Sequence, residues 1–200
     1  MSENSELGLI LVISGPSGVG KDTVWQAASR CLPTFSKAIT CTTRERRPHE
    51  VEGVDYFFVS DAEFDRMIRE DELIEWAYVH NLGHRYGVPE SSVFKRINDG
   101  DDVVCVIDVQ GALRIRRLFP QAMLVFIKPP QGRESETLEA RIQGRSAVDA
   151  TELATRLETA NWELTQVQLY DYQIENDDVE RAANELCEVI EREKARREEV

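Results

Sequence analysis

The stretch SGPSGVGKDT, residues 14–23, directly follows the apolar run Leu9 to Ile13. It fits the pattern G-x-x-x-x-G-K-[ST] up to its last position, where Asp22 replaces a hydroxyl residue. A strand, a glycine-rich turn and a helix in this order bring backbone N–H groups together around an anion. The sequence therefore predicts a loop that binds nucleotide phosphates. Its expected residues are Gly15, Pro16, Ser17, Gly18, Val19, Gly20, Lys21, Asp22 and Thr23.

Asp22 has three interpretations. It is an outward-pointing acid in the first turn of a helix, where a negative charge is favourable, or it binds magnesium directly or through water. The third interpretation is that it marks a change of substrate. Thr23 still offers a hydroxyl one position later, so the sequence indicates an altered site and not an inactive one.

The composition limits the possible partners. The chain has 200 residues and a net charge of -13, which suits one compact domain whose field repels nucleic acid and anionic membranes. The N-terminus MSENSELG does not resemble a targeting signal, and the apolar runs are too short to span a bilayer, so we expect a cytoplasmic protein. The cysteines are widely spaced without a CxxC pair, and we expect reduced packing thiols at Cys31, Cys41, Cys105 and Cys187.

Buried strands alternate with helices along most of the chain. The apolar runs 9–13, 103–107 and 123–127 are each followed by helical spacing, which predicts an α/β fold with a parallel sheet and helices on both faces. Short strand-like pieces at 37–43, 54–60 and 73–79, with a helix at 61–70, predict an inserted lobe. Further along, we expect a helix at 151–166, a last strand at 170–174 and a closing helix capped by Asp178.

Three arginines crowd together inside this acidic chain. Arg44, Arg46 and Arg47 precede Tyr56, and paired guanidinium groups with a tyrosyl hydroxyl suit the binding of a terminal phosphate. A basic turn that makes surface ion pairs is the alternative.

Together these segments resemble the guanylate kinase family. SGPSGVGK, TTRxxRxxEVxGxDYxF, LIEWAxVH, YGVP, DVQGA and END occur in the family's order from Leu9 to about Leu186. The resemblance implies a P-loop NTP hydrolase-type sheet and transfer of the γ-phosphoryl of ATP to GMP, and to dGMP, with Mg. It also implies a core of residues 1–36, 91–138 and 159–200, a GMP-binding lobe of residues 37–90 and a lid of residues 139–158.

The same resemblance assigns roles to individual residues. The GMP phosphate would be held by Arg44, Arg47, Tyr56 and Tyr86, and guanine by Thr40, Glu75 and Asp108. Charge on the transferring phosphoryl would be neutralised by Lys21, Arg44 and the lid residues Arg141, Arg145 and Arg156. Asn176 would lie near the adenine of ATP, and Asp22 and Asp108 would hold the metal.

Glu75 also has a chemical reason for its role. The Watson–Crick edge of guanine has two adjacent N–H donors that one carboxylate can accept together, whereas adenine presents an acceptor there. A carboxylate left unpaired by the wrong base discriminates against that base.

Two positions depart from the family pattern. Val88 stands where a hydroxyl residue is usual, so one guanine contact is missing, and Val106 stands where an acid is common. If Asp22 reaches the metal, it would compensate for the acid that is missing at position 106; this hypothesis rests on the two substitutions alone.

Two alternatives remain at this point. A related ribose 1,5-bisphosphate phosphokinase carries the same GKD in its loop, but it would leave Glu75 and the arginine block without a purpose. A non-catalytic guanylate-kinase-like binding module would not need Lys21 or the lid arginines.

Overall fold

The computed structural model describes residues 8–79, 83–145 and 150–198. Its centre is a five-stranded sheet in which every strand pair is parallel. Across the sheet the strands are β2 (Phe35–Lys37), β7 (Asp102–Val106), β1 (Ile10–Ser14), β8 (Met123–Lys128) and β9 (Tyr172–Glu175). The predicted α/β fold is confirmed.

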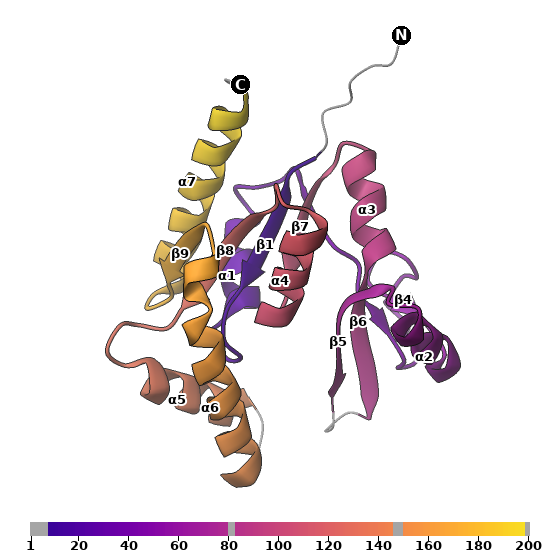
Figure 1. Cartoon of the computed structure of the whole chain (residues 1–200), viewed down its shortest axis with the longest axis horizontal. Helices are drawn as coiled ribbons and strands as arrows, with labels where there is room; N and C mark the ends of the chain where they lie inside the picture. Colours follow the sequence, from indigo (N-terminus) through magenta and orange to yellow (C-terminus); the bar gives the residue numbers. More distant parts are fainter. Residues whose placement is uncertain (1–7, 80–82, 146–149, 199–200) are drawn as a thin grey trace.

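Helices cover both faces of this sheet (Figure 1). They are α1 (Lys21–Ala28), α3 (Glu90–Asn98), α4 (Val109–Leu118) and α7 (Val179–Glu198). Leu11 and Ile13 of β1 belong to an apolar cluster with α1 and α7, whereas Ile10 and Val12 belong to a second cluster with α3 and α4. Because both faces are buried, the strands are continuous apolar runs instead of alternating ones.

A second sheet lies to one side of the first (Figure 1). Its order is β4 (Phe57–Phe58), β3 (Cys41–Thr42), β6 (His84–Pro89) and β5 (Leu73–Val79), and α2 (Asp61–Arg69) packs on it. A small core of Cys41, Phe64, Met67 and Leu73 holds this part together. All four strands fall inside the predicted lobe of residues 37–90, although the predicted strand piece 37–43 is divided between the two sheets.

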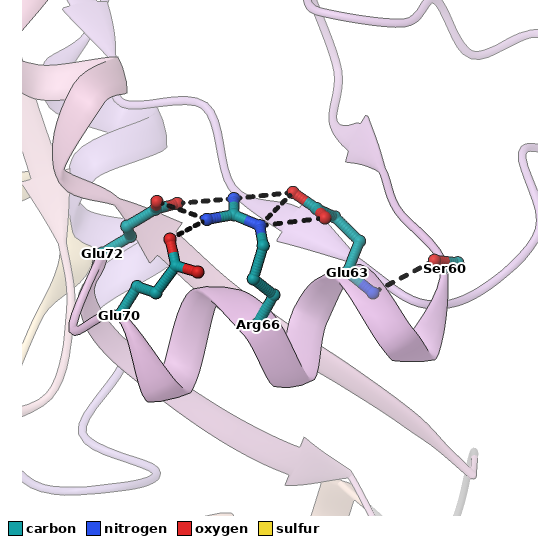
Figure 2. A network of polar contacts seen from close by, with 5 residues as sticks. All are labelled: Ser60, Glu63, Arg66, Glu70 and Glu72. Atoms are coloured by element: carbon teal, nitrogen blue, oxygen red, sulfur yellow. Dashed lines mark hydrogen bonds and ion pairs between the residues drawn. The ribbon is translucent and has the colours of Figure 1, made fainter.

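Helix α2 carries a cluster of ion pairs on its outer side (Figure 2). The Ser60 hydroxyl accepts the Glu63 N–H at 3.1 Å and begins the helix. The Arg66 guanidinium then binds the carboxylates of Glu63, Glu70 and Glu72, all of them partly exposed. Such exposed pairs contribute little to stability, so this cluster mainly orients the helix end.

Two further helices, α5 (Glu134–Arg145) and α6 (Ala150–Thr165), lie on the opposite side from the small sheet (Figure 1). They contain most of the predicted lid. After α6 a short 3-10 turn, Val167–Leu169, leads into β9. Asp178 then begins α7 by accepting the Arg181 N–H at 2.9 Å, as predicted. Among the described helices, none is long and apolar enough to cross a bilayer.

The expectation of four reduced cysteines is wrong for two of them. Cys31, just after α1, forms a disulfide with Cys187 of α7, while Cys41 and Cys105 are free and buried. Burial raises the pKa of the Cys41 thiol to about 11 and that of the Cys105 thiol to about 12. The pair was missed because 156 residues separate its members, and only the packing of α1 against α7 brings them together.

The disulfide predicts the number of free thiols in the protein. Thiol titration of the unfolded, unreduced protein should find only the thiols of Cys41 and Cys105. Adding reductant should expose all four and lower the free energy of unfolding by about 2–4 kcal/mol, because the cross-link restricts the unfolded chain. Four reactive thiols before reduction would contradict the pairing.

Candidate functional site

The glycine-rich loop between β1 and α1 has the backbone that its sequence predicts. Gly15, Gly18 and Gly20 have φ values of 142°, 83° and 96°, which favour glycine. A Cβ atom at Gly15 would lie 2.2 Å from the Ile127 carbonyl oxygen, so the loop lies tightly against β8. The Lys21 Nζ donates to the carbonyl oxygens of Gly15 at 2.7 Å and Pro16 at 3.2 Å. The lysine therefore curls over the loop that should bind phosphates.

Four carboxylates act on the Lys21 charge. Burial lowers the pKa of Lys21, and the nearby charges oppose this lowering. The acids that raise the pKa of Lys21 are, in decreasing order of their contribution, Glu163, Asp22, Glu75 and Asp108. These acids come from four elements: α6, α1, β5 and the start of α4.

Glu163 was missed by the sequence reasoning. It lies on α6 with only 5% of its surface exposed, and its Oε2 accepts the Ser17 N–H of the loop at 3.2 Å. Burial raises its pKa. One signal was present in the sequence, because Glu163 follows Ala160 by three residues on the apolar face of its helix. An acid on such a face needs a buried partner.

Arg141 and Asn176 meet at the other side of the loop. Arg141 of α5 donates from Nη1 to the Val19 carbonyl at 2.7 Å and from Nη2 to the Asn176 carbonyl at 3.1 Å. The Asn176 side chain donates to the same Val19 carbonyl at 2.7 Å and is 2% exposed. Its buried Oδ1 has no hydrogen-bond partner among the described residues. These two predicted residues therefore lie against the phosphate loop.

The other predicted cation and metal ligands are less closely grouped. Arg156 pairs with Glu152 one turn away on α6. Arg145 is the last residue of α5, and its side chain lies outside the described part. Asp22 and Thr23 are exposed, and Asp22 lies 3.3 Å from the Lys37 ammonium. No group of three His, Cys, Asp or Glu side chains that could hold a metal occurs in the described residues.

Glu75 and Asp108 lie together at the amino end of α4. The Glu75 Oε2 accepts the Asp108 N–H at 2.9 Å, and the Asp108 carboxylate in turn accepts the Gly111 N–H at 2.8 Å. Burial, followed by the charge of Asp108, raises the pKa of Glu75 to about 8. A Cβ atom at Gly111 would lie 2.6 Å from the Glu75 Oε2, so only glycine leaves room for this acid.

Val88 lies opposite Glu75 in the β5–β6 pairing and is 5% exposed. It belongs to the apolar cluster that contains Ile74 and Val93. A valine at this position therefore serves the core, where a hydroxyl would need a partner.

The predicted phosphate-binding residues of the small sheet also cluster. The Arg44 guanidinium lies 4.9 Å from the centre of the Tyr56 ring, and the Tyr56 and Tyr86 rings are 6.1 Å apart. The Tyr86 hydroxyl helps to raise the pKa of Arg44. Thr40 lies at the edge of this group, where its carbonyl accepts the Phe57 N–H at 3.0 Å.

Glu50 is the second residue that the sequence reasoning missed. It binds Arg44 through two hydrogen bonds of 2.7 and 2.5 Å, and both side chains are more than nine-tenths buried. It also accepts the N–H of Arg47, whose side chain is exposed. Its only signal was its place in the quoted block of residues 42–58.

Comparisons with known proteins agree with this geometry. A sequence model of the guanylate kinase family matches residues 8–193. The guanylate kinase of Caldanaerobacter subterraneus subsp. tengcongensis is 43% identical over 189 residues, which is 94% of this chain and 89% of that protein. The guanylate kinase of Bacillus subtilis is 41% identical over 196 residues, with coverages of 98% and 94%.

A solved structure extends the likeness to three dimensions. The crystal structure of guanylate kinase from Anaplasma phagocytophilum matches with a TM-score of 0.64 and 33% identity over 94% of this chain and 87% of that chain. The phosphate loop, the acid pair and the arginine cluster all fall inside the matched region. The chain belongs to the guanylate kinase family of ATP-dependent nucleoside monophosphate kinases.

Proposed function

We propose that this protein transfers the γ-phosphoryl group of ATP to GMP, and to dGMP, which yields ADP and the nucleoside diphosphate. The observation that carries the proposal is that the phosphate loop and Asp108 of the acid pair follow neighbouring parallel strands at the same end of the main sheet, where the Ile107 N–H donates to the Ile13 carbonyl at 3.1 Å. An acid pair suited to guanine and a lysine suited to phosphates therefore share one site. The family membership of the chain supports the same reaction.

The reaction needs alignment and charge neutralisation more than proton transfer. An oxygen of the GMP phosphate attacks the γ-phosphorus, and the bond from that phosphorus to the bridging oxygen of ADP breaks. The loop amides and Lys21 would bind the phosphates of ATP, with Asn176 near its adenine. Arg44, Arg47, Tyr56 and Tyr86 would hold the GMP phosphate, while Thr40, Glu75 and Asp108 contact guanine.

Lid movement completes the site in this proposal. Arg141 already contacts the loop, whereas Arg156 is paired within its own helix. Closure of residues 139–158 over the core would bring Arg141, Arg145 and Arg156 to the transferring phosphoryl group and exclude water.

Magnesium fits the residues of the site. Carboxylate oxygens are ligands that magnesium prefers, and Asp22 lies directly after Lys21 at the end of the phosphate loop. Asp22 and Asp108 are the exposed acids among the four that act on Lys21 and would hold the ion together with phosphate oxygens and water. When bound, the metal would neutralise charge on the phosphates.

A comparison of acceptors tests the reaction. With ATP and magnesium, we expect ADP release with GMP and dGMP, and kcat/KM for GMP at least about 100-fold above that for AMP or UMP. Turnover of ribose 1,5-bisphosphate alone would replace the proposal by a sugar phosphokinase. Nucleotide binding without turnover would indicate a binding module.

Glu75→Gln should raise the KM for GMP by about 100-fold and leave the KM for ATP nearly unchanged, because an amide cannot accept both guanine N–H groups. Initial rates at varied GMP and ATP measure both constants. Glu72→Gln is a matched control, since Glu72 lies three residues earlier and binds Arg66 outside the site. An unchanged KM for GMP would refute the role of Glu75.

The pH dependence gives a further check on Glu75. Only the ionised acid accepts both guanine N–H groups. In the wild type, kcat/KM for GMP should therefore rise with pH up to about 8, where the pKa of Glu75 lies. Glu75→Gln should not show this rise.

The raised pKa of Glu75 also affects stability. Because this pKa is raised in the folded protein from 4.5, the extra bound proton favours folding at low pH. The free energy of unfolding should therefore fall, relative to Glu75→Gln, as pH rises between these values.

Asp22→Asn tests the metal assignment. If Asp22 binds the ion, the magnesium concentration for half-maximal activity should rise by about 10-fold. Lys37→Ala removes the ion-pair partner of Asp22 without removing an oxygen ligand, and we expect no such rise. Equal magnesium dependence in both variants and the wild type would make Asp22 a surface acid of the first helical turn.

A further inference from the structure

Arg44 is held from one side only. A guanidinium has five N–H donors, and those of Arg44 that have carboxylate or carbonyl partners are on Nη1 and Nη2. Nη1 donates to the Glu45 carbonyl at 2.9 Å and to Glu50 at 2.7 Å, and Nη2 donates once, to the other oxygen of Glu50. Among the described residues, no carboxylate or carbonyl accepts from Nε or from the second hydrogen of Nη2.

Arg66 of the same lobe differs from Arg44 in how many of its guanidinium nitrogens have carboxylate partners (Figure 2). Its Nε donates to Glu63, and Nη1 and Nη2 together donate to Glu63, Glu70 and Glu72. Every nitrogen of this guanidinium therefore has a carboxylate partner. Arg44 differs, because its Nε has no carboxylate or carbonyl partner among the described residues and its Nη2 has only one, Glu50.

The surroundings of Arg44 indicate which anion suits these donors. The guanidinium carbon lies 4.9 Å from the Tyr56 ring centre and 5.4 Å from that of Phe58, so two aromatic rings pack against the cation. The Tyr86 hydroxyl also interacts with it. A planar Nε/Nη2 edge beside tyrosyl hydroxyls matches two oxygens of a phosphate monoester.

We propose that Glu50 is a positioning residue that binds the end of the Arg44 guanidinium and thereby presents its Nε/Nη2 edge to the phosphate of the acceptor nucleotide. This inference rests on the proposed function, in which Arg44 contacts that phosphate. Glu50 itself does not touch the substrate. Its task is to fix the orientation of the Arg44 guanidinium in the plane that faces the phosphate.

Glu50 is itself rigidly placed. Its N–H donates to the Arg47 carbonyl at 3.0 Å, its own carbonyl accepts from Arg46 at 2.9 Å, and its carboxylate accepts the Arg47 N–H at 2.9 Å. The ion pair with Arg44 lowers the pKa of Glu50 to about 2, so the acid is charged at neutral pH. The carboxylate of Glu50 thus contacts Arg44 and Arg47, and its backbone carbonyl contacts Arg46.

Glu50→Gln tests the inference because glutamine keeps the size and can still accept the Arg47 N–H, but it loses the charge and the paired acceptance from Arg44. We expect the KM for GMP to rise by about 10- to 100-fold and the KM for ATP to change by less than about twofold. Calorimetry should show weaker binding of GMP and unchanged binding of guanosine, which lacks the phosphate. Glu63→Gln, which removes a carboxylate from Arg66, is the matched control and should leave all four values unchanged.

Other outcomes overturn the inference. Unchanged GMP binding in Glu50→Gln would show that Arg44 needs no such support, and an equal loss of GMP and guanosine binding would make Glu50 a merely structural residue. If Glu50→Gln does not fold, Glu50→Asp keeps the charge and shortens the reach, and it should raise the KM for GMP while guanosine binding stays unchanged. Failure of the proposed function is recognised separately, because the wild type would then not phosphorylate GMP, or Arg44→Lys would bind GMP normally.

Discussion

The site depends on the hydrogen bond between the Asp108 N–H and the Glu75 carboxylate. Glu75 belongs to the small sheet and Asp108 to the start of a helix that packs on the main sheet. This bond therefore joins the two parts of the protein at the point where their chemistry meets. The Asp108 carboxylate lies at the amino end of α4, where the positive end of the helix dipole partly offsets its negative charge.

Most of the fold could be predicted, because apolar runs and glycine spacing reflect local structure. Strands β1, β7 and β8 follow from their uninterrupted apolar residues, and the loop follows from its glycines and lysine. Strands β2 and β6 were not predicted, since each is short or mixed in polarity and depends on its neighbours for pairing. The site was foreseen in outline from the family resemblance, and the residue roles stay predictions.

What the sequence could not reveal are the contacts between distant side chains. Cys31 and Cys187 meet only because two helices pack together, and Glu163 reaches the phosphate loop only because α6 returns to the core. Helices α5 and α6, which contain most of the predicted lid, both contact this loop, α5 through Arg141 and α6 through Glu163.

Gly111 lies on the first turn of α4, where the Glu75 carboxylate takes the space that a side chain would fill. Even one methyl group there would push the acid away from its backbone donor. In the proposed function, in which Glu75 reads guanine, discrimination between purines is therefore vulnerable to a change at Gly111 even when Glu75 itself is unaltered. Gly111→Ala would keep every acid of the site and remove the space that one of them occupies.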